Sequence, residues 1–256
     1  MAAITLIGSG NAATALGRAL RHAGHRIVQV WSRTEENATV LAGELNATPT
    51  SDLQSINSDA DVYILSVKDD AIEEIAKALP LSGKILAHTS GIKSKDLLHS
   101  SAHYGIFYPF VSMTKDSETD FREVLMMVEG NNEATLEALT RLAQTLSGKV
   151  KQVEERDRQS LHLAAVFANN FTNYLYTVSE QLLQEGGLSF DELRPLVAAH
   201  IQRVMEQSPA NLQTGPAIRR DHSTMDVHLD LLSRHQNLKE VYSLLTSSIQ
   251  DLYPIK

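Results

Sequence analysis

Short apolar runs alternate with helical patterns through residues 1–152 of the chain. Runs rich in β-branched residues predict strands, and apolar residues three or four positions apart predict helices. We expect strands at residues 4–7, 26–31, 62–67, 84–88, 104–108, 124–128 and 149–153. We expect helices at residues 11–23, 35–45, 70–79 and 133–146. This alternation predicts an α/β domain with a doubly wound, mostly parallel sheet and helices on both of its faces.

The pattern from residue 153 to residue 256 is helical only. Residues 154–185 contain neither glycine nor proline over 32 positions, which predicts one long helix. Its middle, residues 161–171, is apolar on nearly every face, so we expect that segment to be buried all round. Further helices are expected at residues 190–206, 223–234 and 236–252, with N-caps at Ser189 and Asp221. The sequence therefore predicts two domains, residues 1–152 and residues 153–256.

A glycine-rich turn separates the first predicted strand from the first predicted helix. Its first glycine permits a tight turn, its second lets the backbone approach a diphosphate, and its small last residue lets the helix pack close to the strand. The amide groups at the helix N-terminus would then face the diphosphate. We expect a Rossmann dinucleotide site formed by Gly8, Ser9, Gly10, Asn11, Ala12 and Ala13. The alternative is a glycine turn that binds no ligand.

The end of the second strand indicates which nicotinamide cofactor the site prefers. Enzymes that use NAD usually place an acidic residue there, which binds the ribose 2′-hydroxyl. This chain has Ser32 and Arg33 instead. Serine can hydrogen-bond a 2′-phosphate, and arginine can pair with it while stacking on adenine. The sequence favours NADP(H). In the alternative, Arg33 is a solvated surface residue and Glu35 or Glu36 binds the ribose.

Composition narrows the class of protein. Hydrophobic residues make up 43% of the chain and charged residues 21%, as in globular proteins with a core. The net charge of −8 disfavours nucleic-acid or anionic-membrane partners. The absence of cysteine excludes disulfides, thiolate metal sites and a cysteine nucleophile. No apolar run is long enough to span a bilayer, and the N-terminal residues lack the basic region of a signal peptide. We expect a cytoplasmic protein.

Four segments, in this order, carry a resemblance to a known family: Gly8-Ser9-Gly10-Asn11-Ala12-Ala13, Trp31-Ser32-Arg33, His88-Thr89-Ser90-Gly91, and Thr214-Gly215-Pro216 through Arg219-Arg220-Asp221. Over essentially its whole length the chain resembles the Rossmann-like NADP oxidoreductases with a helical C-terminal domain of unknown function. It is more distantly similar to pyrroline-5-carboxylate reductase and to the 6-phosphogluconate and β-hydroxyacid dehydrogenases. The resemblance implies a helical domain of the 6-phosphogluconate dehydrogenase type, a homodimer formed through that domain, and substrate contacts from it.

The chain departs from the β-hydroxyacid dehydrogenases at one position. Those enzymes carry a catalytic lysine four residues before an asparagine on the long helix. Here Asn169 and Asn170 lie at such a place, but Ala165 and Val166 precede them by four residues. No lysine occurs between Lys151 and Lys239. The resemblance therefore gives no basis for expecting the lysine-dependent hydroxyacid reaction in this chain.

Two further strand ends supply candidates for the cofactor site. Ligands of doubly wound sheets bind beyond the carboxyl ends of the strands. Residues Ser66, Val67 and Lys68 end one strand, and His88, Thr89, Ser90 and Gly91 end the next. We expect these residues near the nicotinamide, with Ser66, Val67, Lys68, Thr89, Ser90 and Gly91 binding the cofactor. His88 is a candidate proton donor; in the alternative it hydrogen-bonds a loop carbonyl.

Three polar residues lie in the apolar stretch of the long helix. His162 and Asn169 are seven residues apart and would share one face of an α-helix, beside Asn170. Buried polar side chains need partners, which a substrate cleft between the domains would supply. We take His162, Asn169 and Asn170 as candidate catalytic residues. The alternative is that they are core residues of a dimer interface.

The segment from Thr214 to Asp221 reads as a rigid turn that leads into a helix. An arginine pair can bind a substrate carboxylate, so Thr214, Arg219 and Arg220 are candidate substrate-binding residues. An ion pair of these arginines with Asp221 or Asp226 is the alternative. His222 and Asp226 could chelate a metal, but no recognised ligand motif is present and we expect none.

The leading hypothesis is an NADPH-dependent reductase of a small carbonyl or imine compound, with an unknown small-molecule substrate and no nucleic-acid or membrane partner. A second hypothesis is hydride exchange between NADP and another redox carrier of the deazaflavin type. A third, from a different class, is a non-catalytic NADP(H) sensor whose helical domain binds a partner. The missing lysine favours the sensor to some degree.

Overall fold

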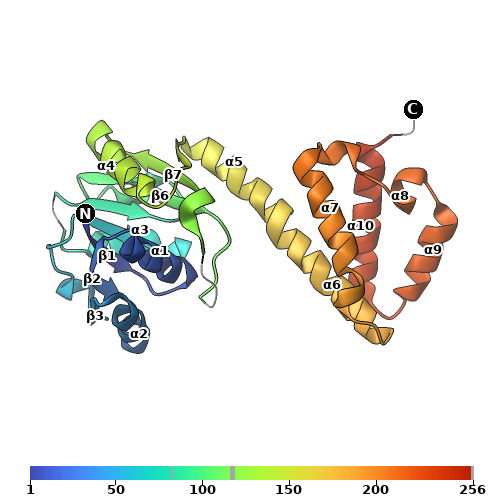
Figure 1. Ribbon diagram of the computed structural model, residues 1–256, viewed down its shortest axis with the longest axis horizontal. Helices are drawn as coiled ribbons and strands as arrows, with labels where there is room; N and C mark the ends of the chain where they lie inside the picture. Colours follow the sequence, from blue (N-terminus) through green and yellow to red (C-terminus); the bar gives the residue numbers. More distant parts are fainter. Residues whose placement is uncertain (82, 116–118, 255–256) are drawn as a thin grey trace. The chain divides into compact units, whose positions relative to one another are not determined.

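The structure is a computed structural model that describes residues 1–81, 83–115 and 119–254 (Figure 1). Its contacts divide the chain into two compact units, Met1–Thr172 and Asn173–Lys256. The sequence placed the domain boundary at residue 153, where the last strand ends. The division by contacts lies 20 residues later in sequence numbering because the first part of the long helix packs on the sheet domain.

The first unit contains one eight-stranded sheet with the order β3-β2-β1-β4-β5-β6-β7-β8. The strands are β1 Ala3–Ile7, β2 Arg26–Trp31, β3 Thr48–Thr50, β4 Val62–Leu65, β5 Ile85–His88, β6 His103–Phe110, β7 Leu125–Gly130 and β8 Val150–Gln152. Every neighbouring pair is parallel except β6 and β7. The predicted doubly wound, mostly parallel sheet is confirmed. The sequence missed β3, a three-residue edge strand in which Pro49 is tolerated.

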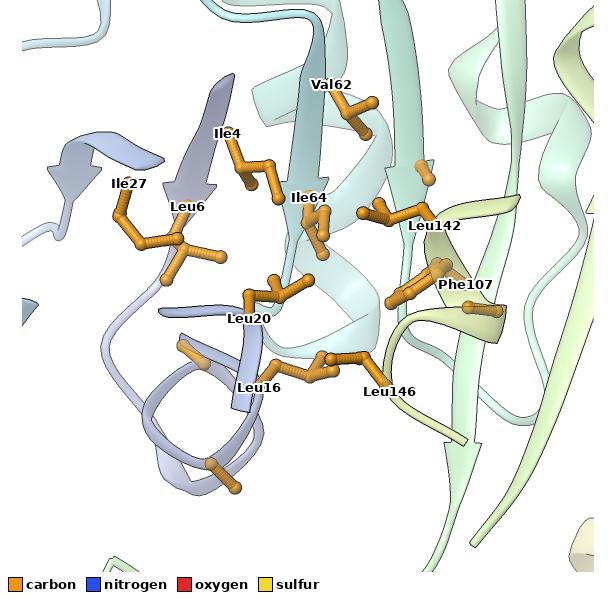
Figure 2. Packing of buried hydrophobic residues seen from close by; sticks show 14 of the residues in the cluster. Ile4, Leu6, Leu16, Leu20, Ile27, Val62, Ile64, Phe107, Leu142 and Leu146 are labelled. Carbon is orange, nitrogen blue, oxygen red and sulfur yellow. The ribbon is translucent and has the colours of Figure 1, made fainter. Parts of the chain in front are cut away.

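Helices cover both faces of this sheet. On one face, α1 Asn11–His22, α2 Glu35–Leu45 and α4 Glu133–Gln144 pack against alternate residues of the strands. Figure 2 shows this core, in which Ile4 and Leu6 of β1 lie near Leu16 and Leu20 of α1. On the other face, Ile7 and Leu65 pack with α3 Ile72–Ala78 and with the 3-10 turn η3 Lys95–Leu98. The predicted helix at residues 70–79 divides into the turn η2 Asp69–Ala71 and α3.

A long run of helical residues follows β8. It comprises α5 Glu155–Ala165, a π-helical segment η5 Val166–Phe171 and α6 Thr172–Glu185, with no break between them. The prediction of continuous helix through residue 185 is therefore confirmed. The sequence did not predict the π-helical segment, which hydrogen-bond spacing defines and hydrophobic periodicity does not.

The prediction that residues 161–171 are buried all round is wrong for the single chain. Leu163, Phe167 and Phe171 are 58%, 62% and 49% exposed. An apolar pattern shows that side chains favour removal from water, but it does not show which chain covers them. These side chains are not covered by the described residues of this chain.

The second unit is helical. Its elements after α6 are η6 Phe190–Glu192, α7 Arg194–Glu206, η7 Pro209–Asn211, α8 Pro216–Arg219, α9 His222–Leu231 and α10 Gln236–Leu252. Ser189 and Asp221 are N-caps, as predicted, and Ser189 forms a capping box with Glu192. The predicted helical C-terminal region is confirmed, and α9 ends three residues earlier than expected.

Candidate functional site

One cavity of about 740 Å³ lies at the carboxyl ends of four parallel strands. It lies where the strand order reverses beside β1, which is the ligand-binding position of doubly wound sheets. The predicted cofactor residues that line it are Gly8, Ser9, Gly10, Asn11, Ala12, Ser32, Arg33, Ser66, Val67, Lys68 and Thr89. Ala13, Ser90 and Gly91 are not among its lining residues; Ala13 is fully buried where α1 packs on the sheet.

The two glycines of the turn meet different requirements. Gly8 has φ of 128°, and a Cβ there would lie 2.2 Å from Ser66 O, so the fold itself requires glycine. A Cβ at Gly10 would meet no atom of the described chain within 4 Å. Gly10 is also the N-cap of α1, and no side chain caps that helix. The turn therefore leaves open space in front of amide donors, which suits a diphosphate.

The end of β2 presents a hydroxyl and a guanidinium to the same cavity. Ser9 Oγ donates to Ser32 Oγ at 2.8 Å, so Ser32 keeps its own hydroxyl hydrogen for another acceptor. Arg33 is exposed, and no group in the described part of the chain hydrogen-bonds or pairs with its guanidinium. Glu35 and Glu36 are absent from the cavity lining, whereas Asn37 in the first turn of α2 contributes to it.

His88 makes the loop contact that the sequence left open as the alternative to catalysis. Its side chain is fully buried, Ser90 N–H donates to Nδ1 at 3.1 Å, and Nε2 donates to Ser94 O at 3.1 Å. Burial lowers the pKa of His88 to about 4. Both ring nitrogens are thus occupied by backbone groups, and the neutral ring holds the loop after β5 in place. These contacts agree with the alternative, in which His88 hydrogen-bonds a loop carbonyl.

A buried ion pair fixes α5 to the sheet and to the same loop. Arg158 Nε donates to Glu129 Oε1 of β7 at 2.5 Å, and the two side chains are 0% and 4% exposed. The other two guanidinium nitrogens donate to Ser90 O at 3.0 Å and to Lys93 O at 2.9 Å. Arg158 therefore fixes the position of α5 relative to the loop after β5. That loop begins at Thr89, which lines the cofactor cavity.

His162 lies one turn farther along α5 and contacts both the loop and the sheet. Tyr108 Oη of β6 lies 3.0 Å from His162 Nδ1. A Cβ at Gly91 would lie 2.3 Å from His162 Nδ1 and 2.9 Å from Tyr108 Cζ, so the absence of a side chain at Gly91 admits both rings. His162, a predicted catalytic residue, thus lies against Gly91. Gly91 is two positions after Thr89, which lines the cavity.

Asn169 and Asn170 lie apart from this cluster. Both side chains are exposed, and both lie within the π-helical segment η5. The seven-residue spacing from His162 to Asn169 gives a shared face only in a regular α-helix, and the wider π turn breaks that relation. The expectation that these asparagines are buried is wrong for the single chain.

The predicted substrate-binding residues belong to the second unit. Arg220 is held by backbone carbonyls of its own unit: it donates to Ala217 O, to Gln250 O and to Tyr253 O. Arg219 and Thr214 are exposed. Asp221 caps α9 through Thr224 N. The guanidinium of Arg220 therefore joins α8 to the end of α10, which is a structural contact.

Two features of the described residues concern other classes of function. None of the helices there is long and apolar enough to cross a membrane. No group of three or more His, Asp or Glu side chains in those residues is arranged to hold a metal ion.

A solved structure from Bacteroides fragilis, with the provisional name NADP oxidoreductase, is 40% identical to this chain. It matches with a TM-score of 0.93 over 98% of each chain. The chain belongs to this NADP oxidoreductase family. NADP(H) is the cofactor of that family. Family membership therefore confirms the cofactor that was predicted from Ser32 and Arg33.

Family comparisons divide this chain into two parts. Residues 3–90 match the family described as NADP oxidoreductase coenzyme F420-dependent, and residues 124–249 match a domain of unknown function, DUF2520. A search of curated proteins found no match. The predicted resemblance, including a helical C-terminal domain of unknown function, is confirmed.

More distant structures share the fold. A reductive aminase from Aspergillus terreus, solved with NADPH4, cyclohexanone and allyl amine, is 18% identical over 98% of this chain and 93% of its own, with a TM-score of 0.73. A 1-pyrroline-5-carboxylate reductase from Streptococcus pyogenes is 17% identical over 99% of each chain, with a TM-score of 0.62. The expected distant similarity to pyrroline-5-carboxylate reductase is confirmed as a similarity of fold.

Sequence reasoning missed several residues of this site. Asn37 could have been selected, because it lies in the first turn of the helix that follows Arg33. Tyr108, Glu129 and Arg158 gave no local signal, since their partners lie 29 to 68 positions away in the chain. The apolar cavity residues Leu53 and Ile75 were likewise indistinguishable from core residues in the sequence.

Proposed function

We propose that this protein is an NADPH-dependent reductase of a small carbonyl or imine compound. The proposal rests above all on one observation: the loop that follows β5 lines the cofactor cavity at Thr89 and packs against His162 at Gly91. A reduction of this kind needs a cofactor site and a group that can donate a proton nearby. The residues that we propose for both lie in the first unit of the chain.

The residues of the cavity fit the parts of NADP(H). Gly10 leaves room for the diphosphate at the N-terminus of α1. Ser32 and Arg33 would bind the 2′-phosphate, because one has a free hydroxyl hydrogen and the other a free guanidinium. At the other end, Thr89 Oγ1 donates to Ser66 Oγ at 3.3 Å, and these hydroxyls would orient the nicotinamide. Bound NADPH supplies the hydride.

In this proposal His162 gives a proton to the oxygen or nitrogen of the substrate. Histidine is the side chain most often used for proton transfer near neutral pH. His162 is half-buried, and in the described part of the chain its Nε2 has no hydrogen-bond partner. Asn169 and Asn170 stay predictions for catalytic residues, and Thr214 and Arg219 stay predictions for substrate-binding residues.

Two other candidate functions are favoured by the family match of residues 3–90 and by the missing helix lysine. The family matched by residues 3–90 is described as coenzyme F420-dependent, which favours hydride exchange with a deazaflavin as the second candidate. The absence of the helix lysine favours an NADP(H) sensor as the third. The reductase and the sensor differ in turnover, and the deazaflavin reaction differs from both in its second substrate.

We further propose that the protein is a homodimer formed through the helical region. Of the described residues in the second unit, only Ala217, Met225 and Leu232 are buried. Twelve large apolar side chains of that unit are exposed: Tyr174, Leu175, Leu182, Leu188, Leu196, Ile201, Met205, Val227, Leu231, Leu244, Leu245 and Leu252. A helical unit with so small a core needs a covering partner, and a second copy is the commonest one.

The dimer can be tested by changing one of these exposed side chains. Leu244 is 66% exposed in the single chain, where a change to glutamate would alter stability by no more than about 0.5 kcal/mol. In a dimer interface the same change buries a charge, so we expect Leu244→Glu to give monomers that unfold at lower temperature. Sedimentation measures the mass. Val40→Glu on α2, at 62% exposure, is the matched control and should remain dimeric. A wild-type monomer at micromolar concentration contradicts the proposal.

The cofactor part is tested by calorimetric titration with NADPH and with NADH. We expect NADPH to bind at least about tenfold more tightly, which corresponds to about 1.4 kcal/mol, and Arg33→Ala to remove most of that preference. Arg26→Ala at the other end of β2 is the matched control, because Arg26 lies outside the cavity lining. Equal affinities in the wild type would refute the assignment of Ser32 and Arg33.

Turnover separates the three candidate functions. The holoenzyme with NADPH is incubated with cyclic imines, with ketones and amines, or with an oxidised deazaflavin, and loss of NADPH absorbance is followed. Reduction of an imine or ketone supports the reductase. Oxidation of NADPH only by the deazaflavin supports the second candidate, and tight binding without turnover in any mixture supports the sensor.

A further inference from the structure

The contact between β6 and α5 points to a second residue that acts in proton transfer. We propose that Tyr108 fixes His162 in the tautomer that carries its proton on Nε2, and that the two side chains form a proton relay toward the substrate. Tyr108 acts through His162, so it is a positioning residue. The relay rests on the proposed function, whereas the tautomer does not.

The hydrogen-bond inventory of the pair selects the tautomer. Among the described residues, Tyr108 Oη contacts His162 Nδ1 at 3.0 Å and hydrogen-bonds no other group. A phenol can donate one hydrogen, and a neutral imidazole has one nitrogen that accepts and one that donates. If Nδ1 donated to the phenol, the phenol hydrogen would lack an acceptor in this half-buried place. With Tyr108 as donor, Nδ1 accepts and Nε2 carries the proton.

The surroundings keep Tyr108 protonated and in place. Burial raises the pKa of the Tyr108 phenol, while the charge of Arg158 acts in the opposite direction and that of Asp69 acts with burial. The two rings lie at 6.1 Å between centroids with an angle of 58°. Gly91 lies against both rings. The ring of Phe110 packs edge-on against that of Tyr108, with 6.3 Å between the ring centroids. The phenol therefore has one orientation relative to the imidazole.

A neutral histidine that gives up its Nε2 proton alone would be left as an anionic imidazolate. This arrangement avoids that anion. When hydride adds to the carbonyl or imine carbon, the oxygen or nitrogen takes one proton from His162 Nε2. As the Nε2–H bond breaks, Nδ1 takes the proton of the Tyr108 phenol, so the imidazole stays neutral. The pair is left with a phenolate on Tyr108, and a proton from solvent restores it. With the hydride supplied by NADPH and this proton supplied by solvent, atoms and charge balance.

The tautomer is measured on full-length protein labelled with ¹⁵N in histidine. Long-range ¹H–¹⁵N spectra distinguish a protonated ring nitrogen from an unprotonated one, and His162→Gln assigns the signals. We expect His162 to show a protonated Nε2 and an unprotonated Nδ1, and Tyr108→Phe to give a mixture of tautomers. A proton on Nδ1 in the wild type, or unchanged signals in Tyr108→Phe, overturns the proposal.

Kinetics test the relay with the substrate found in the turnover screen. We expect Tyr108→Phe to lower kcat by roughly a hundredfold, within the range for loss of acid catalysis, with the NADPH Kd unchanged. In the double variant with His162→Gln, kcat should fall no further than in His162→Gln alone. Tyr104→Phe is the matched control: Tyr104 lies on the same strand, and its hydroxyl donates to Asp96 at 3.3 Å.

The outcomes separate this inference from the proposed function. If His162→Gln is impaired while Tyr108→Phe keeps wild-type kcat, the relay is overturned and the reductase stands. If NADPH binds, the tautomer is as expected and no substrate turns over, the reductase is overturned and the assignment of Tyr108 as the residue that fixes the tautomer stands.

Discussion

Replacing Arg158 with methionine lowers the free energy of unfolding by about 3–5 kcal/mol. The change leaves the carboxylate of Glu129 in a place where its side chain is 4% exposed, with Lys95 as a more distant partner at 3.7 Å. It also removes the donors to Ser90 O and Lys93 O. Removal of one partner leaves the other as an unpaired buried charge, with its full desolvation cost. This should therefore be the largest loss of stability from a single charged side chain in the sheet domain. Denaturant unfolding of the full chain measures it.

The controls distinguish an unpaired charge from a general loss of packing. Arg156→Met changes the same residue type two positions earlier on α5, where the side chain is exposed, and should cost less than about 0.5 kcal/mol. The double variant Glu129→Gln with Arg158→Met removes both charges, so it should be more stable than Arg158→Met alone. If the double variant is no more stable than the single one, the buried charge is not the cause.

Loss of Arg158 should reach beyond stability. Its guanidinium joins β7, α5 and the loop from Ser90 to Lys93, and His162 lies one turn farther along the same helix. The placement of His162 beside Gly91 thus depends on an ion pair whose two residues lie outside the lining of the proposed cofactor cavity. In this protein a buried ion pair of the sheet domain therefore positions the candidate proton donor.

Local signals made the cofactor half of the site predictable. The glycine turn, the strand before it and the helix after it are adjacent in sequence, and their geometry follows from Gly8, which alone can adopt φ of 128° so close to Ser66 O. Ser32 and Arg33 follow directly on a predicted strand, so their place at its carboxyl end was fixed by the strand assignment. Such inferences need only short-range order.

The proton-donor half was only partly predictable. His162 was selected because a polar residue in an apolar helix needs a partner, and that reasoning holds. Its partner Tyr108, 54 positions away, was counted as an ordinary strand residue, since the order of strands decides which helix it meets. Arg158 was overlooked because an arginine on a helix is usually solvated. Asn169 and Asn170 were misplaced because periodicity assumes regular α-helix where the chain forms a π segment.

Replacing Gly10 with valine should abolish NADPH binding and leave the fold intact. A Cβ at Gly10 meets no atom of the described chain within 4 Å, so there is open space where the side chain begins, and φ of −78° suits any residue. The same open space is where the diphosphate would approach the N-terminus of α1. Losing two or more charge-assisted hydrogen bonds, at about 1.5–3 kcal/mol each, weakens binding by more than about a hundredfold. Titration calorimetry with NADPH measures the loss.

Gly43 provides the matched control for this substitution. It is also a glycine with open space around its Cβ position, but it lies on α2 outside the cavity lining. Gly43→Val should therefore bind NADPH as the wild type does, and both variants should unfold within a few degrees of it. Wild-type affinity in Gly10→Val would place the diphosphate elsewhere and remove the physical basis for assigning Ser32 and Arg33 to the 2′-phosphate. Loss of affinity in Gly10→Val alone ties cofactor binding to this turn, because the two variants carry the same side chain and differ only in where it is added.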